Sequence, residues 1–376
     1  MESDLFFNAI TNHLKAQKPL VVYRKPGQSL VTAQLQQKLA KQTFKQHQQE
    51  GFIFAPFYKD EASYFFSIRD AEILKLTSFD KSSIDYAEPT VLPVEREILF
   101  QKQQHVRLIS AAIDEIKQGG CQKIVVSRIA KYAAKEDALS YFKRLLYKYD
   151  SAFVYMWYHP DEGVWLGATP EVLVRTQRNK LKTMALAGTQ SARENQTTFV
   201  WGEKEKKEQA FVTAFIKDNL NAINGVEQIE ISSLKTQVAG KVAHLKTDIS
   251  AKFNPEKLKE IINQLHPTPA VCGTPKDEAS SFLAENENYK RTYYSGYLGE
   301  INKSVTQDRN PRKRNVENSA FRSLSKETDL YVNLRCMKLN EGYVHLFLGG
   351  GITEESDSEM EWEETLKKAS TLASIL

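Results

Sequence analysis

Cysteine is scarce in this sequence, with three among 376 residues: Cys121, Cys272 and Cys336. An odd number of widely spaced cysteines supports neither a disulfide framework nor a metal site built from paired cysteines. We therefore interpret all three as buried, small, apolar residues.

Long apolar runs are also missing, because none approaches the roughly 18 residues that a membrane-spanning helix requires. The first residues, Met1–Asp4, carry acids where a secretory signal has basic residues. A net charge of +4 is small for this length and argues against nucleic acid or a membrane surface as the main partner. We therefore expect a cytoplasmic protein with no nucleic-acid or membrane partner.

The composition is that of an ordinary globular protein, with 41% hydrophobic and 26% charged residues spread along the chain. Apolar residues at helical spacing over 106–116 are followed by Gly119 and Gly120, which is typical of a helix and its end. Strand pairs around short turns are predicted over 152–158 with 164–167, 172–175 with 181–187, and 330–338 with 343–348. The pattern predicts an α+β fold dominated by hairpins.

One segment, Lys303–Glu327, is rich in Arg, Lys, Asn and Ser and has few apolar residues to bury. We interpret it as a mobile loop between two strands. A basic nucleic-acid patch is the less favoured interpretation, because Phe321 is the single aromatic residue in the segment.

Two pairs of carboxylates stand on predicted helices. Glu205 and Glu208 precede an apolar helical stripe, and Glu361 and Glu364 lie on one side of the last helix. Each pair alone is better explained as a solvated helix face, and Glu364 with Lys368 as an exposed ion pair. Together the pairs have the ligand chemistry that one Mg²⁺ ion prefers, although spacing does not show that they meet.

The order of short motifs is more specific than any one of them. They are KIVVSR at 123–128, GATPEVL at 167–173, LAGT at 186–189, EKEKKE at 203–208, His244, HPTPA at 266–270, YKR at 289–291, YSG at 294–296, Leu334 with Arg335, LGGGI at 348–352 and EWEET at 361–365. In this order the chain resembles the chorismate-binding enzymes. The resemblance implies a single large domain over 1–376, similar to anthranilate synthase component I. It would have two layers of mainly antiparallel sheet, flanking helices and a central cleft. Residues 1–99 are a divergent part without such motifs, and 100–374 carry the catalytic part.

Within this family, the enzymes that use water as the nucleophile have a lysine at the position of Lys123. The chain is thus similar to the isochorismate synthases, which add water at C2 of chorismate and release the C4 hydroxyl. The resemblance implies that Lys123 is the general base and Glu171 the general acid. Burial beside apolar neighbours would favour a neutral amine and a protonated carboxyl.

The resemblance also implies the residues that hold the substrate and the metal. Chorismate carries two carboxylates, so the pocket needs cations and backbone donors. The implied substrate-binding residues are Ala187, Gly188, Thr189, His244, Arg335, Gly349, Gly350 and Lys368. The implied Mg²⁺ ligands are Glu208 and Glu364, with Glu205 and Glu361 beside them. Taken alone, His244 is equally typical of a core histidine, and the glycine run of a bulge or turn.

Other members of the family give the alternatives. A salicylate synthase shares the first step and then eliminates pyruvate. An anthranilate or aminodeoxychorismate synthase large subunit uses ammonia from a glutaminase partner, which Lys123 argues against. We expect no obligatory glutaminase subunit and a monomer, and the sequence does not decide between menaquinone and siderophore pathways.

Overall fold

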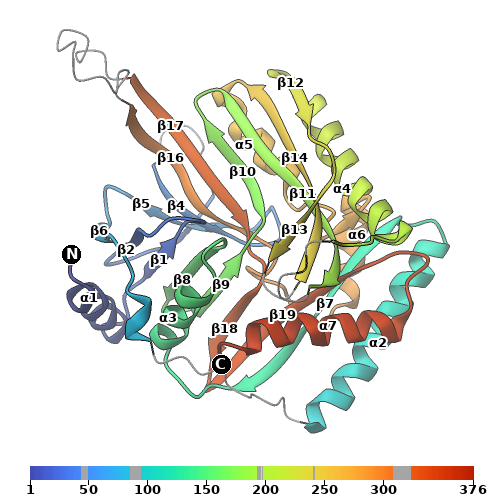
Figure 1. The fold of residues 1–376 in the computed structure, drawn as a ribbon, viewed down its shortest axis with the longest axis horizontal. Coiled ribbons are helices and arrows are strands. Elements are labelled where there is room, and N and C mark those ends of the chain that lie inside the picture. Colours follow the sequence, from blue (N-terminus) through green and yellow to red (C-terminus); the bar gives the residue numbers. More distant parts are fainter. Residues whose placement is uncertain (44–49, 85–94, 193–195, 197, 240–241, 308–322) are drawn as a thin grey trace.

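The computed structural model describes residues 1–43, 50–84, 95–192, 196, 198–239, 242–307 and 323–376. Two large sheets pack face to face, and helices cover their outer faces (Figure 1). Every described strand pairing is antiparallel. The predicted α+β fold with two antiparallel layers is therefore confirmed.

The first sheet contains nine strands within the described residues. Their spatial order is β15 (Gly273–Thr274), β7 (Lys123–Ala133), β19 (Tyr343–Ile352), β18 (Cys336–Asn340), β9 (Gly163–Thr169), β8 (Phe153–His159), β1 (Leu20–Arg24), β2 (Val31–Leu35) and β6 (Glu72–Leu76). The Gly349–Gly351 run lies inside β19, in continuous register with β7. It forms a regular strand, where the sequence alone had also suggested a bulge or a turn.

The second sheet contains ten strands within the described residues. Their order is β12 (Val226–Ile231), β14 (Val242–Phe253), β11 (Lys180–Ser191), β10 (Val172–Gln177), β17 (Ser323–Val332), β16 (Tyr297–Gln307), β4 (Gly51–Ala55), β5 (Ser63–Ser67) and β3 (Lys41–Gln42), and β13 (Lys235–Ala239) pairs with β14. The hairpin of β16 and β17 extends beyond the body of the molecule (Figure 1).

An aromatic core lies between the sheets, because the large inward-facing side chains of the central strands are aromatic. Phe54 of the second sheet stacks on Trp157 of the first, with ring centroids 4.4 Å apart. Trp165 stacks on Phe347 at 5.0 Å. Because aromatic pairs have preferred geometries, the Phe54–Trp157 pair fixes how the two sheets face each other, whereas Trp165 and Phe347 both belong to the first sheet.

Helices bury the outer faces through apolar stripes. On the first sheet these are α1 (Ser3–Lys15), α3 (Ala138–Lys148) and α7 (Ser358–Ala373), and on the second α4 (Glu203–Asn221) and α5 (Leu258–Leu265). Two further helices, α2 (Glu95–Lys117) and α6 (Lys276–Asn286), pack beside β7. Short 3₁₀ turns occupy Lys81–Ser83 and Pro255–Lys257. No described helix is both long and apolar enough to cross a bilayer.

Two of the points at which the chain passes from one sheet to the other lie side by side. The chain leaves β9 and enters β10 at Pro170 and Glu171, and it leaves β17 and enters β18 over 333–335. The prediction of one strand over 330–338 is therefore wrong, because Arg335 has a positive φ of 48° that breaks the extended backbone. The crossings are bonded to each other: the amide of Val332 donates to Glu171 O at 3.0 Å, and that of Ala168 to Arg335 O at 3.2 Å.

The prediction of a loop over 303–327 is wrong at both ends of that range. Residues 303–307 and 323–327 are paired in β16 and β17, with Lys303 opposite Glu327. Such a polar ribbon needs no apolar core, because its two strands satisfy each other's backbone groups. Residues 308–322 lie outside the described residues. The three cysteines are buried and free, as predicted.

Candidate active site

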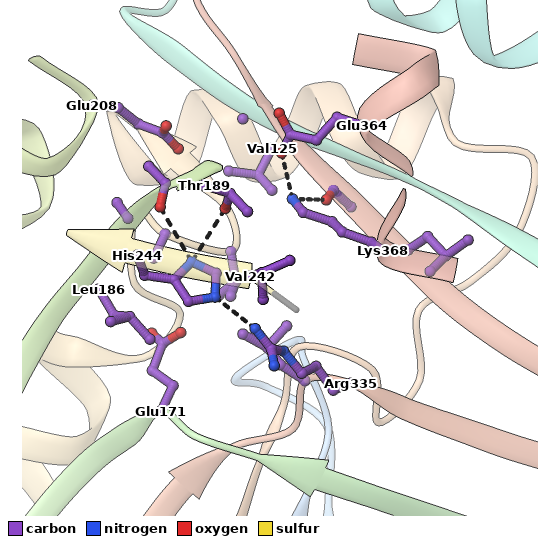
Figure 2. Close-up of a pocket in the computed structure, with 18 of the residues that line it drawn as sticks. Val125, Glu171, Leu186, Thr189, Glu208, Val242, His244, Arg335, Glu364 and Lys368 are labelled. Carbon is purple, nitrogen blue, oxygen red and sulfur yellow. Dashed lines mark hydrogen bonds and ion pairs between the residues drawn. The ribbon is translucent and has the colours of Figure 1, made fainter. Parts of the chain in front are cut away.

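A pocket lies beside the two crossings, between both sheets and helices α4 and α7 (Figure 2). Eleven of the predicted site residues line it: Glu171, Ala187, Gly188, Thr189, Glu205, Glu208, His244, Arg335, Gly349, Glu364 and Lys368. Figure 2 shows Glu208 and Glu364 at one end of the pocket, with Glu171 and Arg335 at the other. Lys123, Gly350 and Glu361 lie directly behind this lining, because they contact Glu208, Gly351 or Lys204.

Glu171 is held at the first crossing with its side chain buried. It is 3% exposed, and burial raises the pKa of its carboxyl to about 8, against the opposing charges of Lys123 and Arg335. The carboxyl therefore carries a proton at neutral pH. A buried, protonated carboxyl at the wall of a pocket has the properties of a general acid.

Lys123 begins β7 and is completely buried. Its Nζ lies 2.9 Å from Glu208 Oε1 and makes no well-aligned hydrogen bond with the described residues. Burial alone would raise the pKa of Glu208, but Lys123, together with the charges of Lys368 and Lys204, holds that pKa below its usual value. The apolar surroundings predicted for Lys123 are thus only part of its environment, since a carboxylate from α4 faces it.

His244 of β14 connects Arg335 to the turn at Gly188. Its Nε2 lies 2.6 Å from Arg335 Nη2, and its Nδ1 lies 3.2 Å from both Gly188 O and Thr189 Oγ1. The guanidinium can only donate, so Nε2 accepts and Nδ1 carries the proton. Burial, with the charges of Arg335 and Lys368, lowers the pKa of His244 to about 3. His244 is therefore a neutral residue that orients Arg335.

The segment Ala187–Thr189 forms an irregularity in β11. The register with β14 shifts between Ala187 and Thr189, and Gly188 has a φ of +70°. A side chain on Gly188 would also meet Cβ of Glu205 at 3.0 Å. Glycine is therefore required here both by the backbone and by the close approach of α4.

Lys368 and the glycine run connect α7 to β19. Lys368 Nζ donates to Gly349 O at 2.8 Å and lies 2.7 Å from Glu364 Oε1. A Cβ added at Gly351 would lie 2.5 Å from Glu208 Oε1 and 2.9 Å from Lys123 Cε. The absence of a side chain on β19 thus makes room for the Lys123–Glu208 pair.

The four predicted metal ligands lie on α4 and α7, and three of them are paired with lysines. Glu208 faces Lys123, Glu364 faces Lys368, and Glu361 accepts hydrogen bonds from Lys204 and from Ser356, the latter at 2.8 Å. Burial and the charge of Glu364 raise the pKa of Glu361, although Lys204 opposes this. In this arrangement no three acidic, His or Cys side chains of the described part converge as ligands of an ion.

Sequence reasoning missed Lys204, which lines the pocket and pairs with Glu361. The signal was its place inside the acidic EKEKKE segment, where we considered only the carboxylates. Apolar lining residues were also missed, since nothing in a strand pattern distinguishes core from pocket wall: Val125, Leu186, Val242, Val271 and Leu372.

Comparison with known proteins gives a family match over nearly the whole chain. A family model described as chorismate binding enzyme matches residues 14–374. The match includes most of the 1–99 segment, in which we had found no motifs.

Three curated relatives are isochorismate synthases. MenF of Haemophilus influenzae is 26% identical over 336 residues, which are 87% of this chain and 71% of that protein. MenF of Pasteurella multocida is 32% identical over 285 residues, or 72% of this chain and 60% of that protein. EntC of Escherichia coli is 26% identical over 292 residues, or 75% and 69%.

Solved structures share the fold. MenF, the menaquinone-specific isochorismate synthase from Escherichia coli, superposes with a TM-score of 0.75 at 21% identity, covering 96% of this chain and 89% of that one. Anthranilate synthase component I from Streptococcus pneumoniae gives 0.62 at 16% identity, covering 94% and 90%.

Proposed function

This chain belongs to the chorismate-binding enzyme family, and on that premise we propose that it is an isochorismate synthase. Water adds at C2 of chorismate, the ring double bond shifts, and hydroxide leaves from C4 with a proton, so that substrate and product are isomers. The relatives named as isochorismate synthases support this choice within the family. The observation that carries it is a buried, protonated Glu171 in one pocket with Glu208, which pairs with Lys123 behind the lining.

Glu171 supplies the proton that the departing hydroxyl needs. Hydroxide is a poor leaving group, and a carboxyl that keeps its proton to about pH 8 delivers it as the C4–O bond breaks. The charges of Arg335 and Lys123 then stabilise the carboxylate that remains.

Lys123 holds the attacking water at C2 and accepts its proton at Nζ. No described residue makes a well-aligned hydrogen bond with this buried Nζ, so its hydrogen-bonding capacity is what the attacking water would use. The neutral amine is the form that accepts a proton, so the proposed cycle requires proton exchange within the Lys123–Glu208 pair.

Arg335 and Lys368 bind the two carboxylates of chorismate. Arg335 is oriented by the neutral His244, which accepts a hydrogen bond from Nη2. Lys368 lies at the wall formed by Gly349. Val125, Leu186 and Val242 provide apolar contacts for the ring.

Mg²⁺ is the proposed metal, with Glu208 and Glu364 as ligands and Glu205 and Glu361 beside them. The donor set fits, because carboxylates from two helices face one pocket and the ammonium groups of three lysines now neutralise three of them. When bound, Mg²⁺ would supply positive charge that orients and neutralises a substrate carboxylate.

The test is product analysis after mixing the protein with chorismate and Mg²⁺. Isochorismate should form without pyruvate and without any ammonium source, and Lys123→Ala and Glu171→Ala should each remove turnover. Release of pyruvate would instead identify a salicylate synthase. Turnover that requires ammonium would identify an amine-forming member of the family.

A further inference from the structure

A second cavity, of about 720 Å³, lies beside the candidate active site and shares no lining residue with it. It is enclosed by α2, the middle of β7, residue 345 of β19 and residues 286–289 after α6. Its volume is within the range of small-molecule sites, which is about 300 to 1,000 Å³. The proposed reaction makes no use of it.

The lining of this cavity carries positive charge only. Arg107, Arg128 and Lys131 line it together with His105 and His345, and none of the described lining residues is Asp or Glu. Behind the lining, Glu287 accepts a hydrogen bond from Ser127. The charge of Glu287 is already neutralised by Arg291, whose Nη2 and Nε donate to it at 2.6 and 2.7 Å. The cavity is therefore suited to an anion.

Arg128 is a buried cation without a carboxylate partner. Its Nε donates to Thr365 Oγ1 at 2.8 Å, its Nη1 donates to Gln101 at 3.3 Å, and its guanidinium lies 4.2 Å from the Trp362 ring. Its Nη2 has no hydrogen-bond partner among the described residues, although the side chain is 7% exposed. A buried guanidinium is normally paired with an anion, so a partner is missing here.

His105 gives a second, independent sign of an incomplete site. It is 3% exposed, lines the same cavity, and its Nδ1 also has no hydrogen-bond partner in the described part of the chain. Two orphaned polar atoms beside one cavity are unusual, because buried polar groups are nearly always satisfied. A bound anion that accepts from Arg128 Nη2 and from the Nδ1–H tautomer of a neutral His105 would satisfy both.

We propose that this cavity binds a small organic anion, whose carboxylate or phosphate group is held by Arg128 and His105. Phe100, Leu108 and Ile129 line the same space and suit an apolar body attached to the anionic group. Arg107, on the exposed side of α2, and Lys131 add attraction at the margin. Because Trp362 and Thr365 belong to α7, the ligand would contact the guanidinium that braces this helix.

The test uses isothermal titration of the full chain with benzoate, with inorganic phosphate, and with benzamide as the neutral counterpart of benzoate. We expect benzoate to bind and benzamide not to bind, with phosphate showing whether the anionic group alone is enough. Arg128→Gln should weaken binding by at least roughly 10-fold, because a charge-assisted contact is lost. Arg107→Gln should weaken it by about 2- to 3-fold through lost long-range attraction.

Matched variants separate this site from the active site and from a folding defect. Lys117→Gln, an exposed substitution on the same helix, should leave the affinity unchanged. Arg335→Gln should also leave it unchanged, because Arg335 lines the other pocket. Benzoate binding that survives Arg128→Gln and Arg107→Gln, or that is lost in Arg335→Gln, would overturn the proposal. So would equal binding of benzamide. Since Arg107 is exposed, its variant keeps the test valid even if Arg128→Gln fails to fold.

Discussion

Glu171 is the residue whose environment departs furthest from that of an ordinary carboxyl, since burial raises its pKa to about 8. Glu171→Gln keeps the shape of the side chain and removes the proton donor. We expect turnover of chorismate to fall by about 10² to 10⁴-fold, the usual range for losing a general acid. The activity of the unmodified enzyme should also decline as the pH rises through about 8. A pH profile of kcat/KM for both proteins would check these expectations, and activity of the unmodified enzyme that does not decline above pH 8 would exclude Glu171 as the acid.

The same substitution has an opposite effect on stability. A carboxyl whose pKa is raised by folding contributes stability that is fully present below its unfolded pKa and is lost as the pH rises through about 8. Glutamine cannot ionise. The free energy of unfolding of Glu171→Gln should therefore increase relative to the unmodified protein between pH 5 and pH 9, as measured by urea denaturation.

The three glycines of β19 should differ in their tolerance of alanine. A Cβ at Gly351 would lie 2.5 Å from Glu208 Oε1, whereas one at Gly350 has a single neighbour at 3.5 Å, Glu361 Oε2. Gly351→Ala should reduce turnover by at least roughly 10-fold, because about 1.4 kcal/mol of disturbance at the Lys123–Glu208 pair is enough. Gly350→Ala is the control and should stay near full activity. Equal effects in a steady-state assay would contradict this account.

At the scale of elements, α4 and α7 each bring a carboxylate to the same pocket. Titration calorimetry with Mg²⁺ in the absence of chorismate should therefore detect binding, which Glu208→Gln and Glu364→Gln each weaken by roughly 10-fold or more, as expected when one of few carboxylate ligands is lost. Glu363→Gln is the matched control, because Glu363 is exposed on α7. Unaltered Mg²⁺ affinity in both pocket variants would rule out this ligand set.

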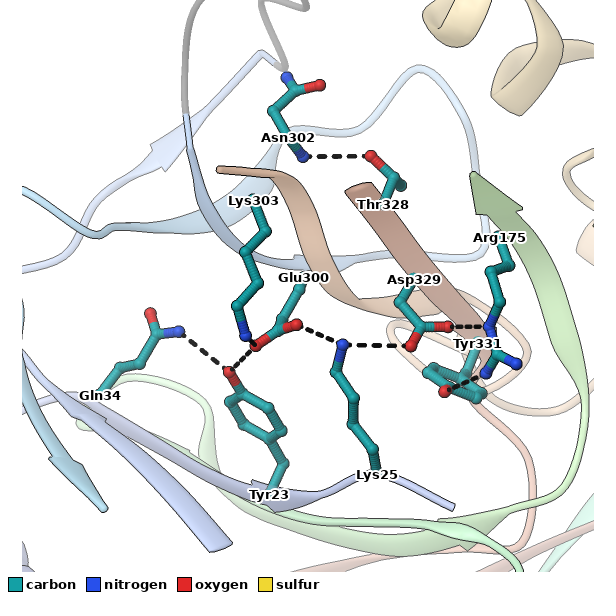
Figure 3. Close-up of polar contacts among 10 residues, drawn as sticks. All are labelled: Tyr23, Lys25, Gln34, Arg175, Glu300, Asn302, Lys303, Thr328, Asp329 and Tyr331. Carbon is teal, nitrogen blue, oxygen red and sulfur yellow. Dashed lines mark hydrogen bonds and ion pairs between the residues drawn. The ribbon is translucent and has the colours of Figure 1, made fainter. Parts of the chain in front are cut away.

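A cluster of charged side chains joins the two sheets (Figure 3). Lys25, just after β1, pairs with Glu300 of β16 and lies 3.2 Å from Asp329 of β17, while the hydroxyl of Tyr23 donates to Glu300 at 2.6 Å. Lys25→Met should lower the free energy of unfolding by about 1 kcal/mol, because Glu300 keeps Lys303 and Asp329 keeps Arg175 as partners. Lys206→Met, which breaks an exposed pair on α4, should hardly change the unfolding midpoint.

Many of the helices and strands could be predicted from the sequence, because local residue patterns determine where they begin and end. The helix ending before Gly119 and the hairpin around Gly163 follow from periodicity and turn residues, and the structure has both. The switch from β17 to β18 could not be predicted, because Leu330–Lys338 is uniformly compatible with a strand. Most residues of the candidate site were predicted from the resemblance of the motifs to those of the family. The resemblance gave no warning that lysines would pair with the carboxylates, since Lys204 and Glu361 are 157 positions apart.

At the scale of the whole molecule, the first 99 residues are structural parts of both sheets. β1 lies between β8 and β2, and β4 pairs with β16. A chain that begins at residue 100 should therefore lose its cooperative thermal unfolding transition, because it exposes the inner strands of both sheets. A chain that begins at residue 17 lacks only α1 and should keep that transition at a lower temperature. Differential scanning calorimetry would decide, and a folded 100–376 fragment would refute this view.

Glu171 and Arg335 stand on segments that belong to both layers at once, and the backbone bonds between those segments tie the layers together. These bonds fix the backbone positions of Glu171 and Arg335 relative to both sheets, so this wall of the pocket is rigid. The opposite wall rests on helices braced by side chains such as Lys368 and Thr365. We therefore expect substitutions on α4 and α7 to change the size of the pocket without moving Glu171.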